Sequence, residues 1–302
     1  MPPALTPHLY ELLVQQDNVV ALWQLTAPER RAAIRAAQHE QWRSLTRQVY
    51  LGAPGEASTD QLVRAAQLHG GKHARLSGRA ALILHGWNQE HRTPHDVVVP
   101  HAVQPMPGPE WMRIHRVRRE PHGPEAVPLR TSPHVATAHA GSWARTDREA
   151  LFVVISSLQQ RLTSPVHLRE AVAQMPCLRR RALILDAVAD YANGAQSLNE
   201  RDFAALCRRF HVPEPERQTL VRDAKGKVRA IDARFRAASG REIRVEIEGL
   251  HHLDPAQYFA DVDRHNDLAF TDPATSLRIT TWHLRHDPVP FMTNLGWLIL
   301  HG

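Results

Sequence analysis

The sequence predicts an α/β protein built from several domains. Its 302 residues exceed the usual size of one domain, and its 43% hydrophobic and 23% charged residues are ordinary for a globular protein. Apolar residues recur at helical spacing through much of the chain, whereas several runs in the last third alternate apolar and charged residues. We therefore expect four segments, 1–55, 56–127, 128–194 and 195–302.

A helix, a short helix, a basic helix and a hairpin are predicted in this order within residues 1–55. Thr6 and Pro7 begin the first helix, and the basic helix begins near Pro28 with Ile34 as its main apolar position. Residues 42–51 alternate like a hairpin. This order outlines a winged helix-turn-helix, a fold that binds double-stranded DNA.

Five arginines are the candidate DNA contacts of this segment. A recognition helix would turn its arginines toward the major groove, while arginines of the wing would meet phosphates. The helix residues are Arg30, Arg31 and Arg35, and those of the hairpin are Arg43 and Arg47. The alternative is a solvated basic helix face that binds no ligand.

Residues 56–127 are predicted to form a small α/β unit, and residues 128–194 a helical bridge. The small unit has expected helices at 60–69 and 76–87 and expected strands at 96–100 and 112–116. A loop rich in proline and glycine, 121–128, leads to helices at 149–162 and 166–192, the second broken near Pro176. We interpret the small unit as a packing scaffold and the helices of the second segment as a bridge between the two ends of the chain. The basic run 179–181 is either a solvated face of this bridge or the lining of a DNA channel.

The last segment, 195–302, is predicted to be a mixed sheet flanked by helices. Strands are expected at 228–235, 243–247 and 277–284, and a helix begins at Asp287. On the middle strand Ile243, Val245 and Ile247 face the core, so Glu246 and Glu248 share the other face.

Carboxylates gather where the first two of these strands form a ribbon, because Asp232 lies on the hairpin partner of Glu246 and Glu248. Converging carboxylates repel one another unless a cation lies between them. A hard cation such as Mg²⁺ or Mn²⁺ prefers oxygen ligands. The sequence thus predicts a metal site, with an exposed acidic strand face as the alternative.

Five short motifs in residues 195–302 carry a family resemblance. They are S-x-x-E (197–200), I-D-x-x-F (231–235), V-E-I-E-G-x-x-H (245–252), D-x-D-R-x-N-x-L (261–268) and L-R-I (277–279). In this order they resemble the nuclease-fold domain of actinobacterial proteins similar to very-short-patch-repair (Vsr) endonucleases. Those proteins belong to the PD-(D/E)xK, restriction-endonuclease-like superfamily.

The resemblance implies a role for each acid. Glu200 matches the acid of the first helix, while Asp232 and Glu246 match the acids of two neighbouring strands, and all three are the implied metal ligands. Glu248 stands where a lysine is typical of the superfamily. His252 matches the histidine of the G-x-x-H motif, where it would act as general acid or base.

The N-terminal segment resembles the antitoxin domain of AbiEi-type proteins. The pattern consists of Gln24-Leu25 followed by Trp42-Arg43-Ser44-Leu45-Thr46-Arg47-Gln48-Val49-Tyr50. Gln48 departs from it, because the family usually has glycine before Val-Tyr. The resemblance implies DNA binding by this segment.

The net charge, the cysteines and the apolar content of the sequence indicate the kind of partner and the cellular compartment to expect. A formal charge of +6 and a pI of about 9.9 favour a polyanionic partner. The two cysteines, Cys177 and Cys207, lie far apart and are expected to be reduced core residues. With neither a signal peptide nor an apolar run of roughly 18 residues, we expect a cytoplasmic protein without a membrane segment.

The sequence therefore predicts a magnesium- or manganese-dependent DNA endonuclease with a DNA-binding N-terminal domain. Defence, repair and a toxin–antitoxin-like system are the contexts that would use such an enzyme. The alternative is a DNA-binding regulator or antitoxin that keeps an inactive nuclease fold, and RNA cleavage is a third option. A homodimer or a protein partner stays open.

Overall fold

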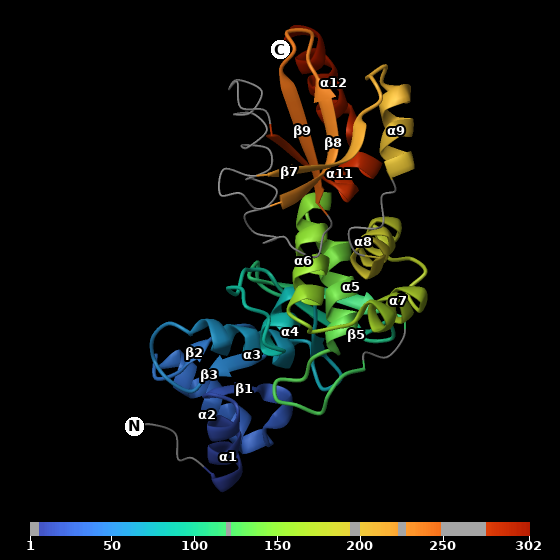
Figure 1. The fold of residues 1–302 in the computed structure, drawn as a ribbon. Coiled ribbons are helices and arrows are strands. Elements are labelled where there is room, and N and C mark those ends of the chain that lie inside the picture. The colour runs from blue at the N-terminus through green and yellow to red at the C-terminus, as the bar shows by residue number, and fades with distance from the viewer. Residues whose placement is uncertain (1–5, 119–121, 194–199, 223–227, 249–275) are drawn as a thin grey trace. The chain divides into compact units, whose positions relative to one another are not determined.

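The computed structural model describes residues 6–118, 122–193, 200–222, 228–248 and 276–302 (Figure 1). The chain divides into two compact units. The first comprises residues 1–144 and 160–179, and the second comprises residues 145–159 and 180–302. The predicted boundaries at 55 and 127 fall inside the first unit, and the one at 194 falls inside the second.

The N-terminal part of the first unit combines helices with a three-stranded sheet. Its elements are α1 (Pro7–Gln15), β1 (Val19–Ala21), a short 3-10 helix (Leu22–Gln24), α2 (Ala27–Gln38), β2 (Arg43–Ser44) and β3 (Val49–Leu51). Strand β3 pairs antiparallel with both β1 and β2, in the order β1-β3-β2. The predicted helices and hairpin are present, and β1 adds a strand that the sequence pattern did not indicate.

Helix α2 packs through its small residues. Ala33 and Ala36 are buried, together with Glu29, whereas Ile34 is 37% exposed. The prediction that Ile34 is the main apolar position is therefore wrong. Residues 29, 33 and 36 follow helical spacing on one face, and Ile34 lies beside that face rather than on it.

A buried carboxylate, Glu29, joins the starts of α1 and α2. Thr6, the N-cap of α1, donates its hydroxyl to Glu29 Oε1, and Thr26, the N-cap of α2, donates both its N–H and its hydroxyl to Oε2 at 2.8 Å. Burial alone would raise the pKa of Glu29, but hydrogen bonds from Thr6, Thr26 and His8 lower it to about 2.

The remainder of the first unit surrounds a second small sheet. Its elements are α3 (Thr59–His69), β4 (Arg75–Leu76), α4 (Gly78–Leu84), β5 (His95–Pro100), β6 (Met112–Val117), α5 (Pro133–Trp143) and α7 (Pro165–Ala173). Strand β5 pairs antiparallel with β4 and parallel with β6. The predicted helix at 76–87 is shorter because Leu76 pairs with Val97 in the sheet and Gly86, at φ +95°, follows the helix end.

The second unit is a four-stranded mixed sheet with helices. Its elements are α6 (Asp147–Gln159), α8 (Arg181–Asn193), α9 (Glu200–Arg209), β7 (Glu216–Arg222), β8 (Val228–Arg236), β9 (Glu242–Glu248), β10 (Ser276–Thr280), α11 (Thr281–His286) and α12 (Pro288–His301). The order is β10-β9-β8-β7, antiparallel from β7 to β9, with β10 parallel to β9. Asp190 of α8 pairs with Arg285 of α11, which ties the bridge helix α8 to this unit.

One prediction for the last strand is wrong. The chain turns into α11 at Thr281 instead of continuing as a strand to Leu284. Thr280 is the N-cap of this helix, and its side-chain hydroxyl accepts a hydrogen bond from the His283 N–H at 3.0 Å. A capping threonine outweighs the apparent alternation of the residues that follow.

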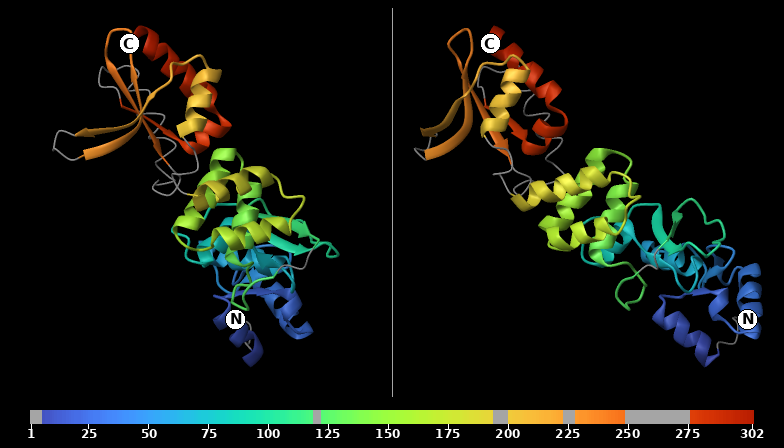
Figure 2. Two further views of the ribbon diagram at one scale, coloured as in Figure 1. Left: turned by 45° about the vertical axis from the view of Figure 1, so that its right-hand side comes forward. Right: turned by 90° about the vertical axis from the view of Figure 1, so that its right-hand side faces the viewer.

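The core of the second unit lies on one face of the sheet. Ile243 and Val245 are fully buried there and Ile247 packs against them, as predicted. Helices α9, α11 and α12 cover this face with Phe203, Leu284, Leu295 and their neighbours, and Figure 2 shows α9 and α12 on the same side of the sheet. Cys207 is buried in this core, but Cys177 is exposed, which corrects the expectation of two core cysteines.

Replacing Glu29 with glutamine should lower the free energy of unfolding at pH 7 by about 2 kcal/mol, because two helix caps lose a charged acceptor. The folded-state pKa of about 2 lies below the ordinary 4.5, so the wild-type advantage exists above pH 4.5 and disappears as the pH falls toward 2. Urea titrations over this range measure it, with the exposed Glu56→Gln as control. A pH-independent difference would contradict the assignment.

Candidate metal centre and nucleic-acid interface

The pairing of β8 with β9 brings two predicted metal ligands close along the backbone. Ala233 and Val245 are partners in the antiparallel ladder, and both are fully buried. Asp232 precedes Ala233 and Glu246 follows Val245, so the two acids occupy the next opposed positions of the two strands. The backbone thus brings together the acids of two different motifs.

The structure describes the other predicted site residues only in part. Glu200 is the first residue of α9, and Glu248 is the last residue of β9, two positions beyond Glu246. The side chains of Glu200, Asp232 and Glu248 are not described, and His252 lies outside the described residues. Within the part of the chain that is described, no three His, Cys, Asp or Glu side chains form a metal site, so the metal centre remains a prediction.

Glu246 has an arginine partner. Its side chain is about one-third exposed, at 35%, and its Oε2 lies 3.4 Å from Arg278 Nε on the neighbouring strand β10. The parallel register makes this contact, because Arg278 and Glu246 are ladder partners. The Glu246 carboxylate is therefore compensated by a guanidinium group, and one of its two oxygens is turned toward that group.

Acids farther along the same sheet are engaged with arginines. Arg234 pairs with Glu216 and Glu242, and Arg244 Nε lies 2.6 Å from Glu242 Oε1. The hydrogen bond from Arg244, with the nearby charges of Arg244 and Arg234, lowers the pKa of Glu242 despite its partial burial. Glu216 and Glu242 thus serve to hold the arginines of this face.

All five predicted DNA-contact arginines are exposed. Arg31 and Arg35 leave α2 on the side away from its buried alanines and are one helical turn apart, whereas Arg30 lies between that side and Ala33. Arg30 Nε also donates a hydrogen bond to the Leu25 carbonyl at 2.9 Å. This helix therefore presents a basic surface to solvent.

The hairpin contributes the remaining two arginines. Arg43 begins β2 and donates a hydrogen bond to the Gly55 carbonyl at 3.0 Å, and Arg47 lies in the loop that joins β2 to β3. Exposed arginines on a helix and on an adjacent hairpin are an arrangement that can contact a duplex in its groove and on its phosphates.

Comparison with protein-family models and with curated proteins gives no match. The function is therefore argued from the residues of this chain. Among the described residues, no helix has the length and apolar character that crossing a bilayer requires.

A polar cluster in the first unit was missed by sequence reasoning. His115 Nε2 lies 2.7 Å from Asp96 Oδ1, and the His115 ring stacks on Trp143 at a centroid distance of 3.6 Å. His139 also stacks on Trp143, at 4.6 Å, and its Nδ1 lies 2.8 Å from Ser77 Oγ. Burial lowers the pKa of His139 to about 4, and His115 acts in the same direction. Ser77, Asp96 and His115 lie far along the chain from α5, which carries both His139 and Trp143, so no local motif could have revealed the cluster.

The double substitution Arg31→Gln/Arg35→Gln should weaken binding to a random-sequence duplex by about 10-fold or more and lower the salt-dependence slope by about two. Two exposed arginines on one helix face lose their charge in this variant, and cations placed in the groove also displace counterions from the duplex. Fluorescence anisotropy at several salt concentrations measures both quantities. Arg169→Gln on α7, also exposed, is the matched control. An unchanged salt slope in the double variant would rule out this surface.

Proposed function

We propose that the protein is a metal-dependent DNA endonuclease, in which the second unit hydrolyses phosphodiester bonds and the N-terminal elements bind the duplex as a winged helix-turn-helix. The observation that supports the proposal is the β8–β9 register: the ladder pairs Ala233 with Val245, and the next pair in that register would be Asp232 and Glu246. Both acids belong to the five motifs that resemble PD-(D/E)xK nucleases.

The donor chemistry supports a hard divalent cation. Directly opposed residues of antiparallel strands direct their side chains to the same face, so carboxylates at 232 and 246 would meet on the side opposite the core. Their mutual repulsion is relieved by a cation, and carboxylate oxygens suit Mg²⁺ or Mn²⁺. Glu200, the third ligand that the resemblance implies, begins α9, which packs on the core face of the sheet, so the two strand acids are the ligands proposed here.

Arg278 fits this arrangement as a phosphate contact. A carboxylate has two oxygens, so Glu246 can face the cation with one oxygen while the other keeps its contact with Arg278. The guanidinium group is about half exposed, at 49%, and can donate further hydrogen bonds to a DNA phosphate. Arg278 would thus orient the scissile phosphate beside the carboxylates.

The reaction is hydrolysis by an attacking water. A bound Mg²⁺ or Mn²⁺ supplies positive charge to the scissile phosphate and lowers the pKa of a coordinated water. Asp232 and Glu246 hold the cation, and Arg278 orients the phosphate. Glu248 and His252 are the residues proposed to take up the water's proton and to protonate the leaving oxygen.

A DNA-binding regulator or antitoxin is the second candidate, and a specific observation favours it. The Arg278 guanidinium group compensates the charge of Glu246, as a retained but inactive scaffold would need. The exposed arginines of α2 and of the β2–β3 hairpin suit either function. The two candidates therefore differ in whether the acids of β8 and β9 are needed for catalysis.

Cleavage of supercoiled plasmid with Mg²⁺ or Mn²⁺ tests the proposal. Asp232→Asn and Glu246→Gln should each slow nicking by about 100-fold or more, because each removes a cation ligand. Glu242→Gln is the matched control, since it removes an arginine-paired acid from the same strand as Glu246. It should cut at nearly the wild-type rate.

Two results would contradict the proposed nuclease activity. Equal cutting by wild type and by Asp232→Asn would mean that the activity belongs to a contaminant or to another site. Tight binding of one promoter duplex with no cleavage of plasmid, linear DNA or RNA in either metal would establish the regulator instead.

A further inference from the structure

The first unit contains a cavity of about 590 Å³ that the proposed nuclease does not use. Its walls come from β6 and the residue after it, from both ends of α5, and from residues 174–178, which follow α7. All described lining residues belong to the first unit. This volume is in the range of cavities that bind small organic ligands.

The described residues that line the cavity include positively charged side chains but no negatively charged ones. Arg116 and Arg118 line it together with several histidines, and the described lining contains no aspartate or glutamate. Both arginines are exposed, and within the described residues neither guanidinium group has an ion-pair partner. A concave surface lined by exposed arginines attracts anions, and guanidinium groups suit phosphate oxygens in particular.

The start of α5 adds to this positive character. Ser132 is the N-cap residue but makes no cap hydrogen bond with its side chain, because its hydroxyl lies 2.9 Å from the His134 ring nitrogen Nε2. Ser132, His134 and Val135 all line the cavity. The positive end of an 11-residue helix and a histidine therefore line the same cavity as the two arginines.

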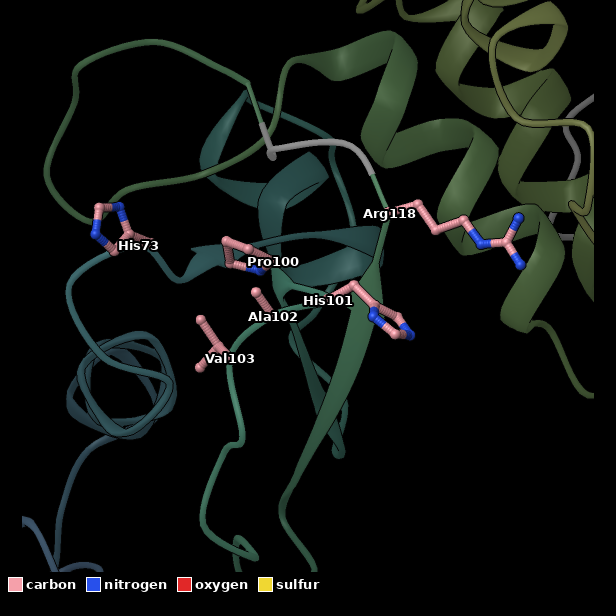
Figure 3. Close-up of a pocket in the computed structure, with 6 residues that line it drawn as sticks. All are labelled: His73, Pro100, His101, Ala102, Val103 and Arg118. Atoms are coloured by element: carbon pink, nitrogen blue, oxygen red, sulfur yellow. The ribbon is translucent and has the colours of Figure 1, made fainter.

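Arg118 also borders a more open hollow of about 540 Å³, lined by His73, Pro100 and Val103 among others. Figure 3 shows that the guanidinium group of Arg118 points away from His73 and Val103. The charged end of Arg118 is thus directed away from the apolar side of that hollow, and we assign it to the 590 Å³ cavity.

Another part of the cavity wall is apolar, and contacts with neighbouring residues fix its aromatic side chain. Val135, Met175 and Leu178 line it, and so does Trp143, whose ring is stacked against His115 and His139. His115 is itself fixed by Asp96, and His139 by Ser77. Such a wall suits the flat or apolar body of a ligand and is already arranged before binding.

We propose that this cavity binds a small phosphate monoester that carries a planar organic group, the chemistry of a nucleoside monophosphate. Arg116 and Arg118 hold the phosphate with the start of α5, and the organic group packs against Trp143 and the apolar wall. The proposal concerns the first unit alone and does not depend on the nuclease.

Calorimetric titration of the full chain with AMP, adenosine and inorganic phosphate tests it. AMP should bind with a Kd of about 1 mM or tighter, and more tightly than adenosine or phosphate alone. Arg116→Gln and Arg118→Gln should each weaken AMP binding by about 10-fold. Arg113→Gln, an exposed arginine of the same strand that does not line the cavity, is the matched control and should bind like wild type.

A second readout needs no variant. Cys177 is exposed and lines the cavity, whereas Cys207 is buried elsewhere, so bound AMP should slow the alkylation of Cys177 by iodoacetamide. Binding of AMP no tighter than adenosine, absence of AMP binding, or an equal loss in Arg113→Gln would overturn the proposal. Binding of a 5′-phosphorylated oligonucleotide without AMP would overturn it in favour of a DNA end.

Discussion

The antiparallel register of β8 and β9 is the constraint on which the second unit depends. Ala233 and Val245 are opposed and fully buried, and Phe235 and Ile243 repeat the pattern two pairs along. A slip of one residue would carry Arg244 and Glu246 into the core and expose Val245. The hydrophobic face therefore fixes the register, and the register in turn makes Asp232 and Glu246 neighbours. One face of the β8–β9 pair packs in the core, and the other face carries the acids of the proposed site.

Elements with strong local signals could be predicted from the sequence. The strands β8 and β9 have clear alternation, and α2 has Pro28 near its start, so each was found close to its observed position. The weak elements were missed. The three-residue strand β1 is stabilised by its pairing with β3, and α5 is rich in alanine and buried along most of its length, so it shows no amphipathic period.

Contacts between distant residues could not be predicted in the same way. The Arg278–Glu246 pair depends on the parallel register of β10 with β9, which no local pattern specifies. The cavity of the first unit brings Arg116 next to residues that follow α7, about 60 positions later in the chain, and only packing of α5 and α7 makes it. The sequence indicated acids and arginines, but the tertiary structure determines which of them meet.

The most direct measurement is the position of Mn²⁺ in crystals of the protein, located by its anomalous scattering. We predict one ion between the carboxylates of Asp232 and Glu246, bound by oxygen ligands, with Arg278 still in contact with Glu246. An ion bound elsewhere, or no ion at these two acids at millimolar Mn²⁺, would contradict it.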